Sequence, residues 1–220
     1  ATLVYGAGLF GVALWSSVRL ADEPAIETSE RPPAAIGALT TDLQLAWVAM
    51  LIPRAASGFV LFHLAFLFRT EEDGGKWLLG AAVGFSSLAI MAGNAVAPSL
   101  RRWLHEERMI AVALALPAAT GIVAAVVGGS RAGIVVAAVV NFAAAICRLS
   151  FESLVQRDGP HENRGRTFAR FETRFQFGWV VAAVIAVVVE MPGSIGYLLV
   201  GVVALAAVFN YQAGARVTLR

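Results

Sequence analysis

Charged residues and cysteine are both scarce in this chain. Only 15% of its 220 residues are charged, whereas about a quarter is usual in a soluble domain. Cys147 is the only cysteine, which excludes an internal disulfide and a cysteine-rich metal cluster. Lysine is almost absent, because Lys76 is the only lysine among 17 basic residues. The composition is therefore unlike that of a soluble globular domain or a disulfide-stabilised one.

Sequence signatures of enzymes are also missing. The chain has no H-E-x-x-H or G-x-S-x-G motif, and its three histidines are scattered without metal-ligand spacing. One G-x-G-x-x-G match begins at Gly6, but it lies inside an apolar run with no strand before it. The net charge of +2 is small, which argues against binding to nucleic acid. We therefore predict no enzyme activity, no cofactor, no metal and no nucleic-acid partner.

Long apolar runs dominate what is present. Apolar residues make up 58% of the chain, and the mean hydropathy is +0.72. Seven runs cover roughly residues 2–18, 45–68, 77–98, 109–129, 132–150, 175–191 and 194–213. A helix of about 20 residues crosses a hydrocarbon core of about 30 Å. Because the runs are continuous and do not alternate, we predict an all-α polytopic bundle of seven transmembrane helices in contact with lipid.

The basic residues between these runs fall on alternate loops. Thirteen lie on one set: Arg19, Arg31, Arg101, Arg102, Arg108, Arg148, Arg157, Arg164, Arg166, Arg170, Arg174, Arg216 and Arg220. The other set has only Arg69, Lys76 and Arg131, and Arg54 lies inside a run. The positive-inside rule makes the thirteen-residue side cytoplasmic. We therefore expect a multi-pass plasma-membrane protein with a cytoplasmic carboxyl terminus.

The longest connection covers residues 20–44 and is rich in proline, acidic and small residues, as in a flexible linker. It divides the chain into a first helix within residues 1–19, a cytoplasmic linker at 20–44, and a six-helix bundle at 45–220. The chain starts at Ala1 within an apolar run that has no basic region before it. We expect it to be a piece of a longer polypeptide.

Two loop segments carry a family resemblance. GNAVAPSLRR at 93–102 is similar to a short cytoplasmic loop motif, although Ala97 and Pro98 stand where that motif has an acidic residue. FESLVQRD at 151–158, followed by RGR at 164–166, is similar to a later loop of bacterial members. Together with the single helix, linker and six helices, these segments resemble helices six to twelve of the major facilitator superfamily. Abundant arginine, alanine, valine and glycine suggest an actinobacterial-like bacterial source.

The resemblance implies transport by alternating access, in which two six-helix halves rock about a site near the middle of the membrane. The amino-terminal half, in the same or a separate chain, would then be a partner of this bundle. The apolar spans favour a small lipophilic or weakly charged substrate, and drug or metabolite efflux is one such function. The alternative is a non-transporting, facilitator-like membrane subunit that binds and positions a partner protein.

Four polar residues inside the runs are candidate substrate-binding residues: Arg54, Ser57, Ser86 and Asn141. A charge inside a membrane span costs about 2.5–3.5 kcal/mol on insertion scales, so it usually faces protein or water. Arg54 therefore binds substrate, forms a gating ion pair, or extends toward the cytoplasm. The neutral residues either bind substrate or hydrogen-bond neighbouring helices. His63, half a turn out of phase with Arg54, is either a titrating group or a satisfied interfacial histidine.

Other residues are candidates for cytoplasmic gating or loop contacts: Arg101, Arg102, Arg148 and Glu152. The spacing of Arg148 and Glu152 predicts an ion pair within one helix, and no acidic residue lies deep in any predicted span. Phe168, Phe171 and Phe175 lie opposite a basic face, which predicts anchoring at the lipid headgroups. The spacing of Gly80 and Gly84 predicts close helix packing.

Overall fold

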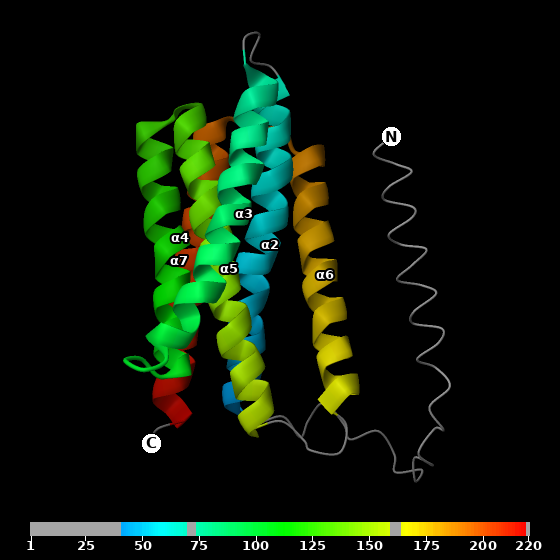
Figure 1. The fold of residues 1–220 in the computed structure, drawn as a ribbon. Coiled ribbons are helices and arrows are strands. Elements are labelled where there is room, and N and C mark those ends of the chain that lie inside the picture. Colours follow the sequence, from blue (N-terminus) through cyan, green and yellow to red (C-terminus); the bar gives the residue numbers. More distant parts are fainter. Residues whose placement is uncertain (1–40, 70–73, 159–163, 219–220) are drawn as a thin grey trace, which may run out of the picture. The chain divides into compact units, whose positions relative to one another are not determined.

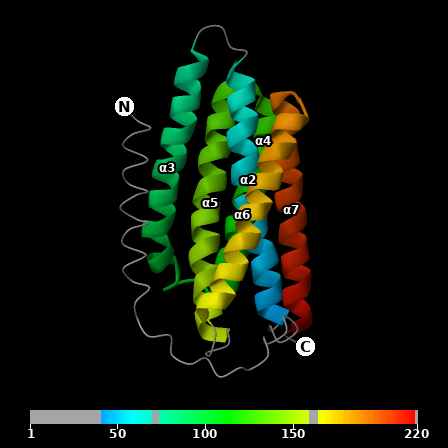
Figure 2. The same ribbon diagram turned by 90° about the vertical axis from the view of Figure 1, so that its right-hand side faces the viewer.

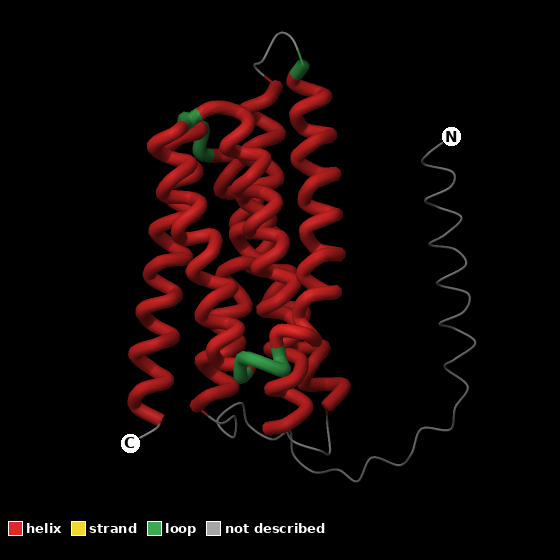
Figure 3. The backbone as a smooth tube through the Cα atoms, turned by 60° about the vertical axis from the view of Figure 1, so that its left-hand side comes forward, coloured by secondary structure: helices red, strands yellow, loops and turns green. Residues whose placement is uncertain are grey.

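The computed structural model describes residues 41–69, 74–158 and 164–218. They all belong to the second of two compact units, residues 39–220. The described part contains six helices and no strand: α2 (Thr41–Arg69), α3 (Gly75–Leu100), α4 (Glu106–Val127), α5 (Gly129–Asp158), α6 (Arg164–Val188) and α7 (Gly193–Thr218) (Figures 1 and 3). The predicted first span at 2–18, and the predicted linker up to residue 40, lie outside the described residues.

Each of the six helices is long and apolar enough to cross a membrane. The candidate spans are Leu43–Arg69, Gly75–Leu100, Glu106–Val127, Gly129–Arg157, Phe168–Val188 and Gly193–Gly214. A span of 22 residues, such as that of α4, is about 33 Å long at the helical rise of about 1.5 Å per residue. These lengths match a bilayer core of about 30 Å. The chain is therefore an all-helical protein in its described part, with the features of a multi-pass membrane protein.

Four of the predicted spans agree with the observed ones to within three residues, and two differ more. Helix α5 continues to Asp158, eight residues past the predicted end, because contacts with α4 hold its last turns. Helix α6 begins at Arg164, eleven residues before the predicted start. Helix α2 begins at Thr41, so the last four positions of the predicted linker are helical.

The helices alternate in direction, and this sorts the charges. Helices α2, α4 and α6 begin, and α3, α5 and α7 end, at the same end of the bundle (Figure 1). We call it the basic end, because Arg101, Arg102 and Arg157 lie there. Arg69 and Lys76 lie at the opposite end. This is the separation of charge that the loop pattern predicts.

The helices form two triplets, α2–α4 and α5–α7, that make equivalent contacts. Helix α3 packs against α5 as α6 packs against α2, and α4 packs against α5 as α7 packs against α2 (Figure 2). Helices α4 and α7 pack against each other, as do α2 and α5. One contact breaks this symmetry. Helix α2 also packs against α3, whereas α5 does not pack against α6 to the same extent. Because α2 and α5 run in opposite directions, the triplets form an inverted repeat.

The apolar core is split into two clusters along the bundle. The cluster nearer the basic end includes Met50, Phe151 and Phe175. The other cluster includes Phe59 and Tyr197. On α2, the residues between Met50 of one cluster and Phe59 of the other include the polar side chains of Arg54 and Ser57.

Glycines allow a close helix approach between α4 and α7. A Cβ atom at Gly121 would lie 2.6 Å from the backbone nitrogen of Gly201 and 2.7 Å from the Tyr197 carbonyl oxygen. At the predicted packing positions Gly80 and Gly84, a Cβ would meet no described atom within 4 Å, so no described helix packs closely there. Spacing alone does not show which face of a helix meets a neighbour.

Helices α3 and α6 lie at the periphery. Only 11% of the apolar segment of α3 and 22% of that of α6 are buried, against 50% for α5. Both helices expose large apolar side chains, including Leu88 and Met91 on α3 and Phe177 and Val184 on α6. These surfaces suit contact with lipid or with another apolar protein surface.

Candidate functional site

A cavity of about 180 Å³ lies among α2, α3, α5 and α6. Its lining residues are Arg54, Ser57, Leu61, Leu64, Leu79, Ala82, Val83, Ser86, Ser87, Ala137, Asn141 and Trp179. The four residues that the sequence suggested for substrate binding are all among them. A cavity of about 150 Å³ is enough to hold a benzene molecule. The space therefore suits a small molecule with one ring or a short apolar chain.

The polar residues of the cavity lie at the edge of the second core cluster, whose Leu64, Ala82 and Ala137 also line it. On α2, Arg54 and Ser57 follow Met50 of one cluster and precede Phe59 of the other. On α5, Asn141 lies between Val140 and Ala143, which belong to different clusters. The polar residues thus lie near mid-depth of the bundle, where a side chain is farthest from water at either end.

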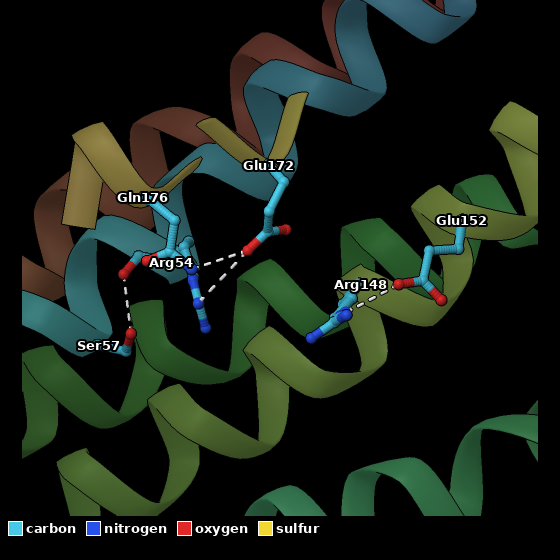
Figure 4. Close-up of polar contacts among 6 residues, drawn as sticks. All are labelled: Arg54, Ser57, Arg148, Glu152, Glu172 and Gln176. Carbon is cyan, nitrogen blue, oxygen red and sulfur yellow. Dashed lines mark hydrogen bonds and ion pairs between the residues drawn. The ribbon is translucent and has the colours of Figure 1, made fainter. Parts of the chain in front are cut away.

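Arg54 reaches across from α2 to α6. Its Nη2 atom lies 3.9 Å from Oε1 of Glu172, and the two side chains are 30% and 50% exposed (Figure 4). Glu172 follows Phe171, which packs against Trp47 on α2, so the guanidinium extends toward the basic end. The sequence left open a substrate contact, a gating ion pair and an extended arginine. The geometry combines a cavity-lining position with an ion pair between helices.

Glu172 itself was missed by the sequence interpretation. We predicted no acidic residue deep in a span, but Glu172 lies inside the observed span Phe168–Val188. The predicted span began at 175, because charged residues interrupt the apolar run before that point. Glu172 also accepts a hydrogen bond from Nε2 of Gln176 at 2.8 Å. The available signal was Arg54, since a guanidinium inside a membrane protein calls for a counter-ion.

The neutral polar residues of the cavity donate hydrogen bonds within their own helices. The Ser57 hydroxyl donates to the Arg54 carbonyl at 2.8 Å, and the Ser87 hydroxyl donates to the Val83 carbonyl at 2.9 Å. Nδ2 of Asn141 donates to the Ala137 carbonyl at 2.9 Å. One alternative was that these residues hydrogen-bond neighbouring helices. The observed bonds instead lie within single helices. They leave the serine oxygens and the Asn141 carbonyl oxygen able to accept further hydrogen bonds.

The basic end holds the candidate gating residues. Nε of Arg148 lies 2.8 Å from Oε1 of Glu152, which confirms the ion pair predicted from their spacing (Figure 4). Arg101 at the end of α3 donates to the carbonyl of Leu149, which ties α3 to α5. Arg102 is exposed beside it. Three of the four predicted residues therefore take part in contacts on or to α5.

Further ion pairs join α4 to the end of α5. Arg157 lies 3.1 Å from Glu107 and 3.8 Å from Glu106. The Ser153 hydroxyl donates to Glu106 at 3.1 Å. These contacts explain why α5 remains helical beyond its apolar run, since its last turns are held by the first turn of α4.

The aromatic residues of α6 pack inside the bundle. Phe171 and Phe175 are buried, and both meet the ring of Phe151 edge to face, at centroid distances of 5.1 and 5.4 Å. Our prediction that they anchor in the lipid headgroups is wrong for these two residues. Arg174 instead covers the Trp47 ring, with its guanidinium carbon 5.3 Å from the centroid. The amphipathic start of α6 thus has its aromatic face in the protein core.

His63 does not line the cavity and lies toward the end of α2 opposite the basic end. Its ring stacks on Phe59 and meets Tyr197 edge to face, and it is 4% exposed. Its Nε2 atom is buried without a hydrogen-bond partner among the described residues. His63 fills the contact between α2 and α7 beside Gly196.

No cluster of three or more metal-ligating side chains occurs among the residues that the structure describes. Comparison with models of known protein families finds no match, and no curated protein matches the sequence. The functional interpretation therefore rests on the cavity, its ion pair and the arrangement of the helices.

Proposed function

We propose that the chain is the carboxyl-terminal part of a major facilitator superfamily transporter in the inner membrane of a bacterium. In this proposal it moves a small lipophilic or weakly charged molecule by alternating access, with the basic end and the carboxyl terminus facing the cytoplasm. Drug or metabolite efflux is the form of transport that we favour.

The observation that carries the proposal is the position of the cavity. Its polar residues lie near mid-depth, and it is lined by two helices from each triplet, α2 and α3 from one, α5 and α6 from the other. Substrate sites near mid-depth between repeats are typical of secondary transporters, and nested three-plus-three inverted repeats are typical of this superfamily. The exchange of contacts between the triplets supports the same architecture.

The exposed surfaces of α3 and α6 support a second half. These two peripheral helices flank the cavity, whereas α4 and α7 line none of it. An amino-terminal six-helix half, in the same or a separate chain, would cover α3 and α6 and close the cavity between the halves. The predicted helix within residues 1–19 would belong to that half.

The contacts at the basic end have a role in this scheme. Arg101 links α3 to α5, and Arg148 pairs with Glu152 on α5. When the halves rock, each moves largely as a rigid body, so contacts within a half must hold. We infer that the link from Arg101 to the Leu149 carbonyl keeps α3 and α5 together within this half.

Flux through reconstituted full-length protein tests the proposal. Radiolabelled weak acids, amines and neutral one-ring compounds would be offered to proteoliposomes, and at least one should exchange faster than across protein-free liposomes. Loss of one substrate hydrogen bond costs about 1–3 kcal/mol, so Asn141→Leu should slow that flux about tenfold or more. Val123→Leu, on the exposed surface of α4, is the matched control and should not change it.

The opposite result has a clear meaning. If no compound crosses, and the purified protein retains a tightly bound second protein, the chain acts as the non-transporting subunit and the transporter proposal is wrong. If Asn141→Leu leaves the flux unchanged, the transported compound does not pass through this cavity.

A further inference from the structure

The cavity has a single charged group at one end and an apolar wall at the other. Among its lining residues only Arg54 carries a charge, while Leu61, Leu64 and Trp179 contribute apolar surface. A guanidinium presents five N–H donors in a planar fork that matches a carboxylate. The cavity therefore has the polarity of a molecule with one anionic end and one apolar end.

Glu172, the present partner of Arg54, uses few of the guanidinium N–H donors. The separation of 3.9 Å between Arg54 and Glu172 is at the limit for an ion pair, and only one nitrogen approaches the carboxylate. The Arg148 and Glu152 pair, at 2.8 Å, shows a close contact in the same bundle. Most donors of the Arg54 guanidinium thus remain for another acceptor.

Glu172 has a second hydrogen bond that does not depend on Arg54. Nε2 of Gln176 donates to it at 2.8 Å, and its side chain is half exposed. If another anion took the guanidinium, Glu172 would keep the Gln176 contact. Its displacement from Arg54 therefore costs a single ion-pair contact of 3.9 Å.

The remaining polar groups favour orientation of a ligand rather than a second charge. The Ser57 and Ser87 hydroxyls and one N–H of Asn141 donate to backbone carbonyls. Their oxygens can accept hydrogen bonds but cannot neutralise an anion. Arg54 is thus the position in the cavity where a negative group gains most.

We propose that the cavity binds a small organic monocarboxylate, with its carboxylate on Arg54 and its apolar body against Trp179, and that Glu172 is the resident competitor that the ligand displaces. This rests on the proposed transport function and names its class of substrate. The displacement gives the cavity two states, one with the Arg54 and Glu172 pair and one with the ligand on Arg54. An uncharged isostere has no means of taking Arg54 from Glu172.

The test is equilibrium binding to purified full-length protein in nanodiscs, measured with radiolabelled acids and their amides. The probes are benzoate with benzamide and hexanoate with hexanamide, two pairs matched in shape and differing in charge. At least one acid should bind more tightly than its amide. Arg54→Gln should weaken binding of that acid about ten- to a hundredfold, as expected for a charge-assisted hydrogen bond.

The distinguishing variant is Glu172→Gln, which keeps the shape and can still accept from Gln176. Removing a competitor held by a weak exposed pair should tighten acid binding about threefold. Glu172→Gln should not change binding of the amide. It should also not change acid binding when Arg54→Gln is present. Glu152→Gln is the matched control, because Glu152 pairs with Arg148 and does not line the cavity.

Three results would overturn the proposal. Weaker acid binding in Glu172→Gln would mean that Glu172 supports the arginine rather than competing for it. Equal binding of acids and amides, or no binding of either acid, would mean that the cavity does not select carboxylates. If neutral compounds are nevertheless carried in the flux assay, the transport function stands and only the substrate class is wrong. Absence of both binding and flux would reject both.

Discussion

At the scale of single residues, two buried serines differ in whether their hydroxyl has an acceptor. Ser150 on α5 is fully buried, and its Oγ has no hydrogen-bond partner among the described residues. Ser57 on α2 is also buried but donates to the Arg54 carbonyl. A buried polar group without a partner costs roughly 1–3 kcal/mol relative to one that is satisfied.

We therefore predict opposite effects of removing the two hydroxyls. Ser150→Ala should raise the free energy of unfolding by about 1 kcal/mol, because the unpaired group disappears. Ser57→Ala should lower it by about 0.5–1 kcal/mol, because a hydrogen bond is lost. Thermal unfolding in detergent measures both. A lower melting temperature for Ser150→Ala would show that its hydroxyl has a hydrogen-bond partner.

The sequence was informative about individual polar residues. A polar side chain inside an apolar run stands out, and all four that were selected line one cavity. Glu172 and Gln176 were missed because they lie in the amphipathic start of α6, where charge is common and carries little information. Only the three-dimensional approach of α6 to α2 makes Glu172 a partner of Arg54.

At the scale of helices, the contact between α4 and α7 depends on two glycines. A Cβ at Gly121 would meet backbone atoms of α7, and a Cβ at Gly201 would lie 2.8 Å from the backbone nitrogen of Ile122. Backbone atoms cannot rotate away as a side chain can. Any added atom must therefore push the two helices apart.

We predict that Gly121→Ala destabilises the bundle by about 1–3 kcal/mol through this overpacking. Gly80→Ala is the matched control, since a Cβ there meets no described atom within 4 Å. It should be neutral, or stabilising by up to about 1 kcal/mol through helix propensity. Melting temperature and the yield of monodisperse protein measure the difference. Equal behaviour of the two variants would contradict the close approach of α4 and α7.

Helix existence was predictable, but helix ends and faces were less so. Apolar runs reveal membrane spans because lipid requires them, yet they say little where a helix leaves the membrane or has an amphipathic start. Helix α5 extends beyond its run because Arg157 pairs with the first turn of α4. Helix α6 starts early because its phenylalanines pack on Phe151. Both effects depend on contacts between distant segments.

At the scale of the whole described bundle, the order of contacts could not be predicted. A helix that is apolar on all sides gives no sign of which neighbour it faces. The exchange of α3 and α6 between the triplets, and the cavity that it creates, became visible only in the structure. The alternation of charge was predictable, because it depends only on the number and order of the spans.

The two-sided exposure of the cavity is the central claim, and Cys147 makes it testable. It is the only cysteine, and it is buried, so Cys147→Ala provides a background without thiols. Single cysteines would replace Ser86 on α3 and Asn141 on α5, one from each triplet. Val123 on α4 and Val202 on α7, both exposed on helices that do not line the cavity, are the matched controls.

The decisive measurement is modification of these cysteines by a membrane-impermeant maleimide, applied to either side of oriented vesicles that contain the full-length protein. For alternating access, cysteines at 86 and 141 should react from both sides, while those at 123 and 202, in lipid, should react from neither. Cavity cysteines that stay unreactive like the controls, or that react from one side only, would contradict a transport path through this bundle.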